Sequence, residues 1–116
     1  MFIAYVVVTT ITIALNAGIA VADLARAKFV LANSAEVGLP RSWIPPLAAL
    51  KAAGAIGLLL GLVGVRPLGI AAAIGLVLFF AGALIAHLRA RVFYNIAFPG
   101  VYFGLAVASL ALALAR

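Results

Sequence analysis

Four long apolar stretches constrain the fold of this chain more than any other feature of its sequence. A helix rises about 1.5 Å per residue and the hydrocarbon core of a bilayer is about 30 Å thick, so roughly 20 apolar residues are enough to cross it. The stretches lie within residues 2–32, 43–65, 67–88 and 96–115. They predict an all-α protein, a transmembrane four-helix bundle with short connections, in one domain over residues 1–116.

The composition agrees with a membrane protein and excludes several chemistries. Only 9% of the residues are charged, against about 25% in soluble domains. The chain has no Cys, which excludes disulfides, thiolate metal sites and iron–sulfur ligation within it. One His and two acidic residues are too few for a zinc site. We therefore expect no metal site and no resident cofactor.

The basic residues give the chain a formal net charge of +6. They stand singly or in pairs at the ends of the apolar stretches, as topology determinants and anionic-lipid contacts do, so we expect a lipid bilayer as partner and no nucleic acid. Two connections hold most of them, and the positive-inside rule makes that side cytoplasmic: Arg26, Lys28, Arg41, Arg89 and Arg91, with Lys51 close by. The sequence thus predicts a multi-pass protein of the cell membrane with both termini outside.

The first helix is expected to continue beyond the bilayer edge, because helical spacing persists to about Ala32. Asp23, Arg26 and Lys28 would then lie near the headgroups, followed by a polar loop over residues 33–42. Trp43 marks the membrane surface at the start of the second helix, since Trp prefers the interface.

Two pairs of glycines have the GxxxG spacing that lets helices approach closely in a membrane. Gly57 and Gly61 belong to the second predicted helix, and Gly100 and Gly104 to the fourth. Both pairs are predicted to be helix-packing residues.

Several motifs make the chain resemble the DoxX-like family of small four-helix integral membrane proteins. They are Asp23-x-x-Arg26-x-Lys28, Pro40, Trp43, Leu50-Lys-Ala-Ala-Gly54 and His87-Leu-Arg89, and the resemblance spans essentially the whole chain. The family takes its name from a subunit associated with thiosulfate:quinone oxidation. The resemblance implies the four-helix fold and an association with redox systems.

Four polar residues are predicted to share a pocket that opens to the cytoplasmic side: Asn16, Asp23, Lys51 and His87. Ionisable groups within a membrane segment are costly and commonly functional. Asn16 lies seven residues before Asp23, hence on the same helix face and about 10 Å deeper. Tyr94 and Tyr102 are further candidates for the lining.

Each of the four has a purely structural alternative. Lys51 could extend its stem to the headgroups, and Asp23 could pair with Arg26 or Lys28. His87 could be an ordinary interfacial histidine, and Asn16 could hydrogen-bond a neighbouring helix. The functional interpretation depends on their coincidence at one face.

Two functions remain open at this point. One is an accessory or binding subunit of a membrane system with a redox association, either a homo-oligomer or part of a larger complex. The alternative is a small membrane enzyme acting on a lipophilic molecule such as a quinone or epoxide, with Asp23 or His87 as acid or base and Lys51 stabilising an anion. The sequence shows no broken helix and no second half that would repeat the first, as transporters have, and this disfavours a transporter.

Overall fold

The computed structural model describes residues 2–115, and these form helices and connections without any strand. The elements are α1 (Phe2–Leu24), α2 (Lys28–Glu36), the 3-10 turn η1 (Arg41–Trp43), α3 (Ile44–Leu62), α4 (Arg66–Ala90) and α5 (Ala97–Ala115). The all-α prediction is confirmed for this part of the chain. α1, η1 with α3, α4 and α5 are each long and apolar enough to cross a membrane.

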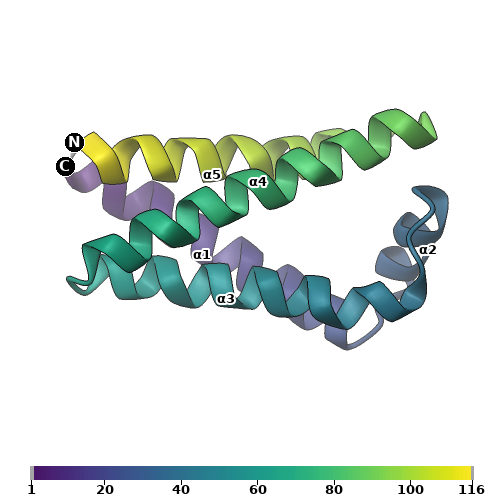
Figure 1. Cartoon of the computed structure of the whole chain (residues 1–116), viewed down its shortest axis with the longest axis horizontal. Coiled ribbons are helices and arrows are strands. Elements are labelled where there is room, and N and C mark those ends of the chain that lie inside the picture. Colours follow the sequence, from purple (N-terminus) through teal and green to yellow (C-terminus); the bar gives the residue numbers. More distant parts are fainter. Residues whose placement is uncertain (1, 116) are drawn as a thin grey trace.

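The four long helices form a closed antiparallel ring. α1 packs against α3, α3 against α4, α4 against α5, and α5 returns to α1. α1 begins and α5 ends at the same end of the bundle (Figure 1). The connections that hold Arg26, Lys28, Arg41, Arg89 and Arg91 lie at the other end.

Apolar side chains cover both the interior and the outside of the bundle. The core cluster consists of Leu58, Ala73, Leu76, Phe80, Tyr102 and Ala106. On the outside, large side chains such as Ile3, Val63 and Leu78 remain 68–78% exposed. An apolar exterior of this extent is unstable in water and stable against lipid tails. The protein is therefore a multi-pass membrane protein.

The first helix ends earlier than the sequence predicts. α1 stops at Leu24 instead of continuing to about residue 32, because Arg26 adopts a left-handed backbone conformation with φ 55°. The Ala27 amide bonds back to the Ala22 carbonyl at 3.0 Å, which closes the helix. No Gly or Pro lies at this break, and the helical spacing of apolar residues continues across it in the sequence.

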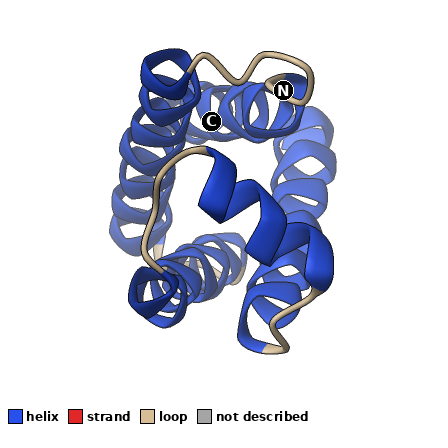
Figure 2. Cartoon of the chain, turned by 90° about the vertical axis from the view of Figure 1, so that its right-hand side faces the viewer, coloured by secondary structure: helices blue, strands red, loops and turns tan. Residues whose placement is uncertain are grey.

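The residues after the break form a separate short helix. α2 lies across the end of the bundle (Figure 2), and the predicted loop over residues 33–42 is helical as far as Glu36. α2 buries Val30 and Ser34. Covering this end of the bundle is therefore its structural role.

The glycines differ in what they face. A Cβ on Gly61 would lie 2.6 Å from the Gly69 Cα, and one on Gly57 would lie 2.6 Å from the Ala72 Cβ, so both lie in a close contact between α3 and α4. A Cβ on Gly100 or Gly104 would meet no atom of the described chain within 4 Å. The structure therefore places the first pair, and not the second, against a neighbouring helix of the same chain.

Candidate functional site

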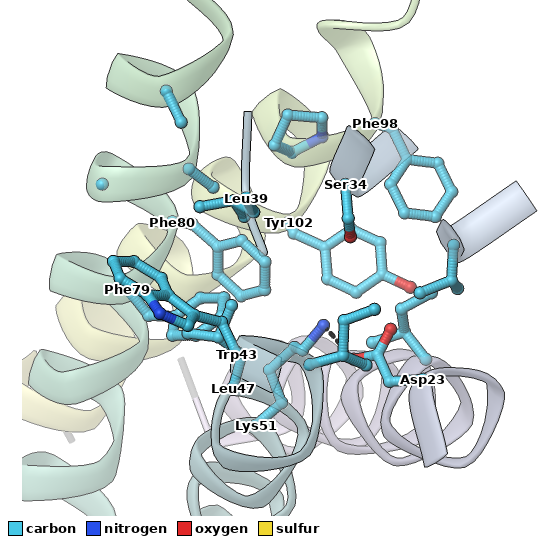
Figure 3. A pocket seen from close by; sticks show the side chains of 17 residues that line it. Asp23, Ser34, Leu39, Trp43, Leu47, Lys51, Phe79, Phe80, Phe98 and Tyr102 are labelled. Carbon is cyan, nitrogen blue, oxygen red and sulfur yellow. Dashed lines mark ion pairs between the residues drawn. The ribbon is translucent and has the colours of Figure 1, made fainter. Parts of the chain in front are cut away.

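The centre of the site is an ion pair between two helices. Lys51 of α3 directs its ammonium Nζ at the Asp23 Oδ2 of α1, and the two atoms are in direct contact (Figure 3). Their side chains are only 11% and 7% exposed. Lys51 therefore points inward rather than along its helix to the headgroups. Two charges this deeply buried are tolerated because each neutralises the other.

A cavity of about 270 Å³ lies above this ion pair. Its walls come from every helix of the chain, and Asp23 and Lys51 supply its charged groups. Aromatic side chains form much of the remaining lining: Trp43, Phe79, Phe80, Phe98 and Tyr102 (Figure 3). The cavity is thus an apolar chamber with a charged floor.

The aromatic rings are ordered by contacts among themselves. The Phe98 and Tyr102 rings stack with centroids 5.3 Å apart, and Phe80 lies 5.2 Å from Tyr102. The Tyr102 hydroxyl donates to the Leu15 carbonyl of α1 at 3.2 Å. Lys51 Nζ lies 5.5 Å from the centroid of the Phe79 ring, a cation–π distance. These contacts preserve flat apolar walls beside the ammonium group.

Helix α2 covers the cavity and is fastened to the connection between α4 and α5. The Tyr94 hydroxyl donates to the Glu36 carboxylate, whose two oxygens lie 2.6 and 2.7 Å away. The Asn95 amide donates to the Asn33 Oδ1 at 2.8 Å. The hydrogen bond to Glu36 raises the pKa of Tyr94 above its ordinary value. We call these two pairs the latch; Ser34 faces the cavity beneath them.

Asn16 lies deeper in the bundle and does not line the cavity. Its amide donates to the Thr12 carbonyl one turn back at 3.0 Å, and its Oδ1 is buried without a hydrogen-bond partner. Thr12 itself is hydrogen-bonded to Ser109 of α5 at 2.9 Å. Asn16 thus belongs to a polar strip between α1 and α5.

His87 is buried, 4% exposed, yet it lies outside the cavity lining. Its Nδ1 is 3.0 Å from the Ala83 carbonyl and donates to it, so Nε2 accepts when the ring is neutral. Nε2 is buried without a partner. Within residues 2–115, no hydrogen bond or ion pair joins His87 to Asp23 or Lys51. The structure therefore brings two of the four candidate residues together and leaves Asn16 and His87 apart.

Most residues of the cavity wall carry no signal in the sequence that marks them as lining a site. Trp43 was expected only as an interfacial marker, and the phenylalanines were indistinguishable from lipid-facing residues in apolar helices. One signal was present: Phe98 and Tyr102 are four residues apart, which places both rings on one helix face. Ser34 falls within the predicted loop, so the sequence does not predict its place on α2, facing the cavity.

No group of three or more His, Asp or Glu side chains that could hold a metal ion occurs in the described part of the chain. The fold and site thus define a small four-helix membrane protein with a charged group at the floor of an internal apolar cavity. A sequence model of the DoxX-like family matches residues 7–109, so the chain belongs to the DoxX-like family. No curated protein and no solved structure matches the chain.

Proposed function

We propose that the protein binds a small lipophilic molecule of the quinone type in the cavity above Asp23 and Lys51. It would do so in the cell membrane as a binding or accessory subunit, in a homo-oligomer or a larger complex with a redox association. The observation that carries the proposal is the buried ion pair at the floor of an otherwise apolar, aromatic cavity.

The ammonium of Lys51 supplies the polar contact. It has three N–H donors, and Asp23 is the ion-pair partner that it has among the described residues. A carbonyl oxygen entering from the apolar side could accept a second N–H, while a planar ring would lie against Phe79 or Tyr102. Aromatic faces attract one another at offset or edge-on geometry.

The size of the cavity favours a single substituted ring over a larger cofactor. Its volume of about 270 Å³ is slightly below the usual range of ligand pockets, about 300–1,000 Å³. A quinone head group fits this description, and an apolar tail would be accommodated by the bilayer. Binding is favoured over the alternative of catalysis on a quinone or epoxide, because His87 lies outside the cavity and Asp23, the other predicted acid or base, is paired with Lys51.

Trp43 provides a direct readout of binding, because it is the one Trp of the chain and lines the cavity. We expect menadione or decylubiquinone to quench its fluorescence saturably when the protein is held in lipid nanodiscs. The Asp23→Asn, Lys51→Met double variant removes the charges together and should bind about tenfold more weakly, since a charged hydrogen bond is worth about 1.5–3 kcal/mol.

A control variant separates binding from partition of the quinone into lipid. Trp43→Phe combined with Leu78→Trp moves the fluorophore to a side chain that is 68% exposed on the outer surface. Its quenching should rise linearly with quinone concentration. Linear quenching of Trp43 as well, unchanged in the double variant, would refute the proposed function.

A further inference from the structure

A second hollow, of about 240 Å³, lies where α1, α2 and η1 meet. Part of its lining is apolar, from Leu24, Leu31, Ile44 and Pro45, and the acidic Asp23 lines it as well. Its rim carries two guanidinium groups and a hydroxyl, from Arg26, Arg41 and Ser42. A concave, partly apolar surface edged by two cations is suited to an amphiphilic anion.

The backbone places Arg26 at this rim at an energetic cost. Its φ of 55° lies in the left-handed region, which costs a residue with a Cβ about 1–2 kcal/mol. Glycine would adopt this conformation freely. Arg91 ends α4 in the same conformation, with φ 56°, so this geometry is a helix-end feature that determines where the Arg26 side chain starts.

Neither acidic side chain of the chain forms an ion pair with these two arginines, although Asp23 lines the hollow. The chain has only two acidic residues; Asp23 is paired with Lys51, and Glu36 accepts from Tyr94. No hydrogen bond or ion pair joins the Arg26 or Arg41 guanidinium to any residue in the range 2–115. Both residues are exposed, so their guanidinium groups are free to meet water, counter-ions or a lipid phosphate.

We propose that this hollow is a binding site for the phosphate group of an anionic lipid. The two guanidiniums and the Ser42 hydroxyl would donate to the phosphate oxygens, in the forked geometry that arginine offers and lysine does not. The apolar part of the lining would cover the carbons next to the phosphate. The neighbouring Trp43, 53% exposed, indicates the level of the membrane interface, where lipid phosphates lie.

Asp23 and Ile44 line both this hollow and the proposed quinone cavity. The lipid site is nevertheless tested separately, because its experiment measures bound lipid and uses no quinone. The experiment uses phosphatidylcholine nanodiscs into which phosphatidylglycerol is titrated, with bound lipid counted by native mass spectrometry. We expect one tightly retained phosphatidylglycerol per chain. Arg26→Gln and Arg41→Gln should each weaken its retention about tenfold, as expected for loss of a charged hydrogen bond.

Two sets of variants distinguish a specific site from general attraction of a basic protein to anionic lipid. Arg89→Gln removes an exposed charge from the same end of the bundle, outside the hollow, and should have about a fivefold effect at most. Arg26→Lys and Arg41→Lys keep the charge and lose the forked donors, and should still weaken retention. Retention that follows charge alone, with both Lys variants like the wild type, would overturn the proposal.

Arg26→Gly adds a test whose expected result, a more stable protein that retains less lipid, differs from the result of misfolding. It relieves the left-handed strain, so the variant should melt at a higher temperature than the wild type in phosphatidylcholine while losing the tightly bound phosphatidylglycerol.

A further experiment titrates inorganic phosphate. Stabilisation by inorganic phosphate that Arg26→Gln abolishes would support the phosphate site with a free ion as ligand. No retained phosphatidylglycerol and no response to phosphate would reject the site.

Discussion

The two ends of the bundle are built in opposite ways. At the end where α1 begins, which we call the closed end, Gly61 of α3 and Gly69 of α4 bring two backbones into contact. Arg66 lies there and donates to the Ala113 carbonyl of α5 at 3.4 Å. At the other end, the open end, α3 and α4 diverge (Figure 1), and the cavity, the ion pair and α2 occupy the space between the helices.

The difference follows from the distribution of side-chain sizes along α4. Its closed-end half presents Gly69 and Ala72 to α3, whereas its open-end half presents Phe79 and Phe80 to the cavity, together with the small residues Gly82, Ala83 and Ala86. Small residues let helices approach in a membrane, and bulky ones separate them. α3 and α4 therefore approach closely where both present small residues to each other, and the charges lie where these helices are apart.

The largest expected effect concerns the ion pair of the open end. Lys51→Met should destabilise the protein by about 3–5 kcal/mol, because Asp23 is left buried and uncompensated. The Asp23→Asn, Lys51→Met double variant should be more stable than Lys51→Met alone, since no charge remains. The measurement is the unfolding free energy in mixed micelles with increasing SDS.

Leu50→Met is the matched control for this prediction. Leu50 is the neighbour of Lys51 on α3 and is 58% exposed on the outside of the bundle, so its substitution should change stability little. A double variant as unstable as Lys51→Met would show that packing, and not the unpaired carboxylate, determines the loss.

The next largest effect is expected at the closed end. Gly61→Ala places a Cβ 2.6 Å from the Gly69 Cα, and because that contact is backbone it cannot swing aside. Overpacking of this kind costs about 1–3 kcal/mol. Gly104→Ala is the control: its Cβ meets nothing of the described chain within 4 Å. Equal stability of the two variants in the same SDS titration would contradict the closed-end contact.

Much of the fold could be predicted from the sequence, because membrane spans depend on length and apolarity alone. The pairing of Asp23 with Lys51 was likewise accessible, since a buried cation is least costly beside the one carboxylate at its depth. The break at Arg26 was not, because no local signal marks it and the burial of Val30 and Ser34 against the bundle determines it.

The rest of the site could not be predicted, because the sequence does not determine how each helix is rotated about its own axis. The sequence predicts His87 and Lys51 at a similar depth in the membrane. Depth does not determine which way a side chain faces around its helix. His87 hydrogen-bonds the Ala83 carbonyl on its own helix and is not among the residues that line the cavity. Gly100 and Gly104 have the same spacing as Gly57 and Gly61 and yet face no helix of this chain, so spacing alone does not identify a contact.

The smallest expected effect concerns the latch of α2. Tyr94→Phe removes the hydroxyl that donates to Glu36, and because the ring is exposed the global stability should hardly change. The backbone amides of α2 should instead exchange with deuterium faster, since one of the two pairs that fasten this helix is lost. Phe93→Leu, beside it in the same connection and 55% exposed, is the control and should leave α2 unchanged.

The latch should also respond to alkaline pH. The hydrogen bond to Glu36 raises the pKa of Tyr94 above 10.0. The Tyr94 hydroxyl therefore holds its proton more tightly in the folded protein than in the unfolded chain. Its contribution is complete below the ordinary tyrosine pKa and is lost as the pH rises through the raised value. Subtracting the tyrosinate absorbance of Tyr94→Phe from that of the wild type isolates this titration. Trp43 emission should change over the same interval in the wild type only. A Tyr94 titration at or below the ordinary value would show that the hydroxyl does not bind the carboxylate and that α2 is held by Asn33 and its apolar face alone.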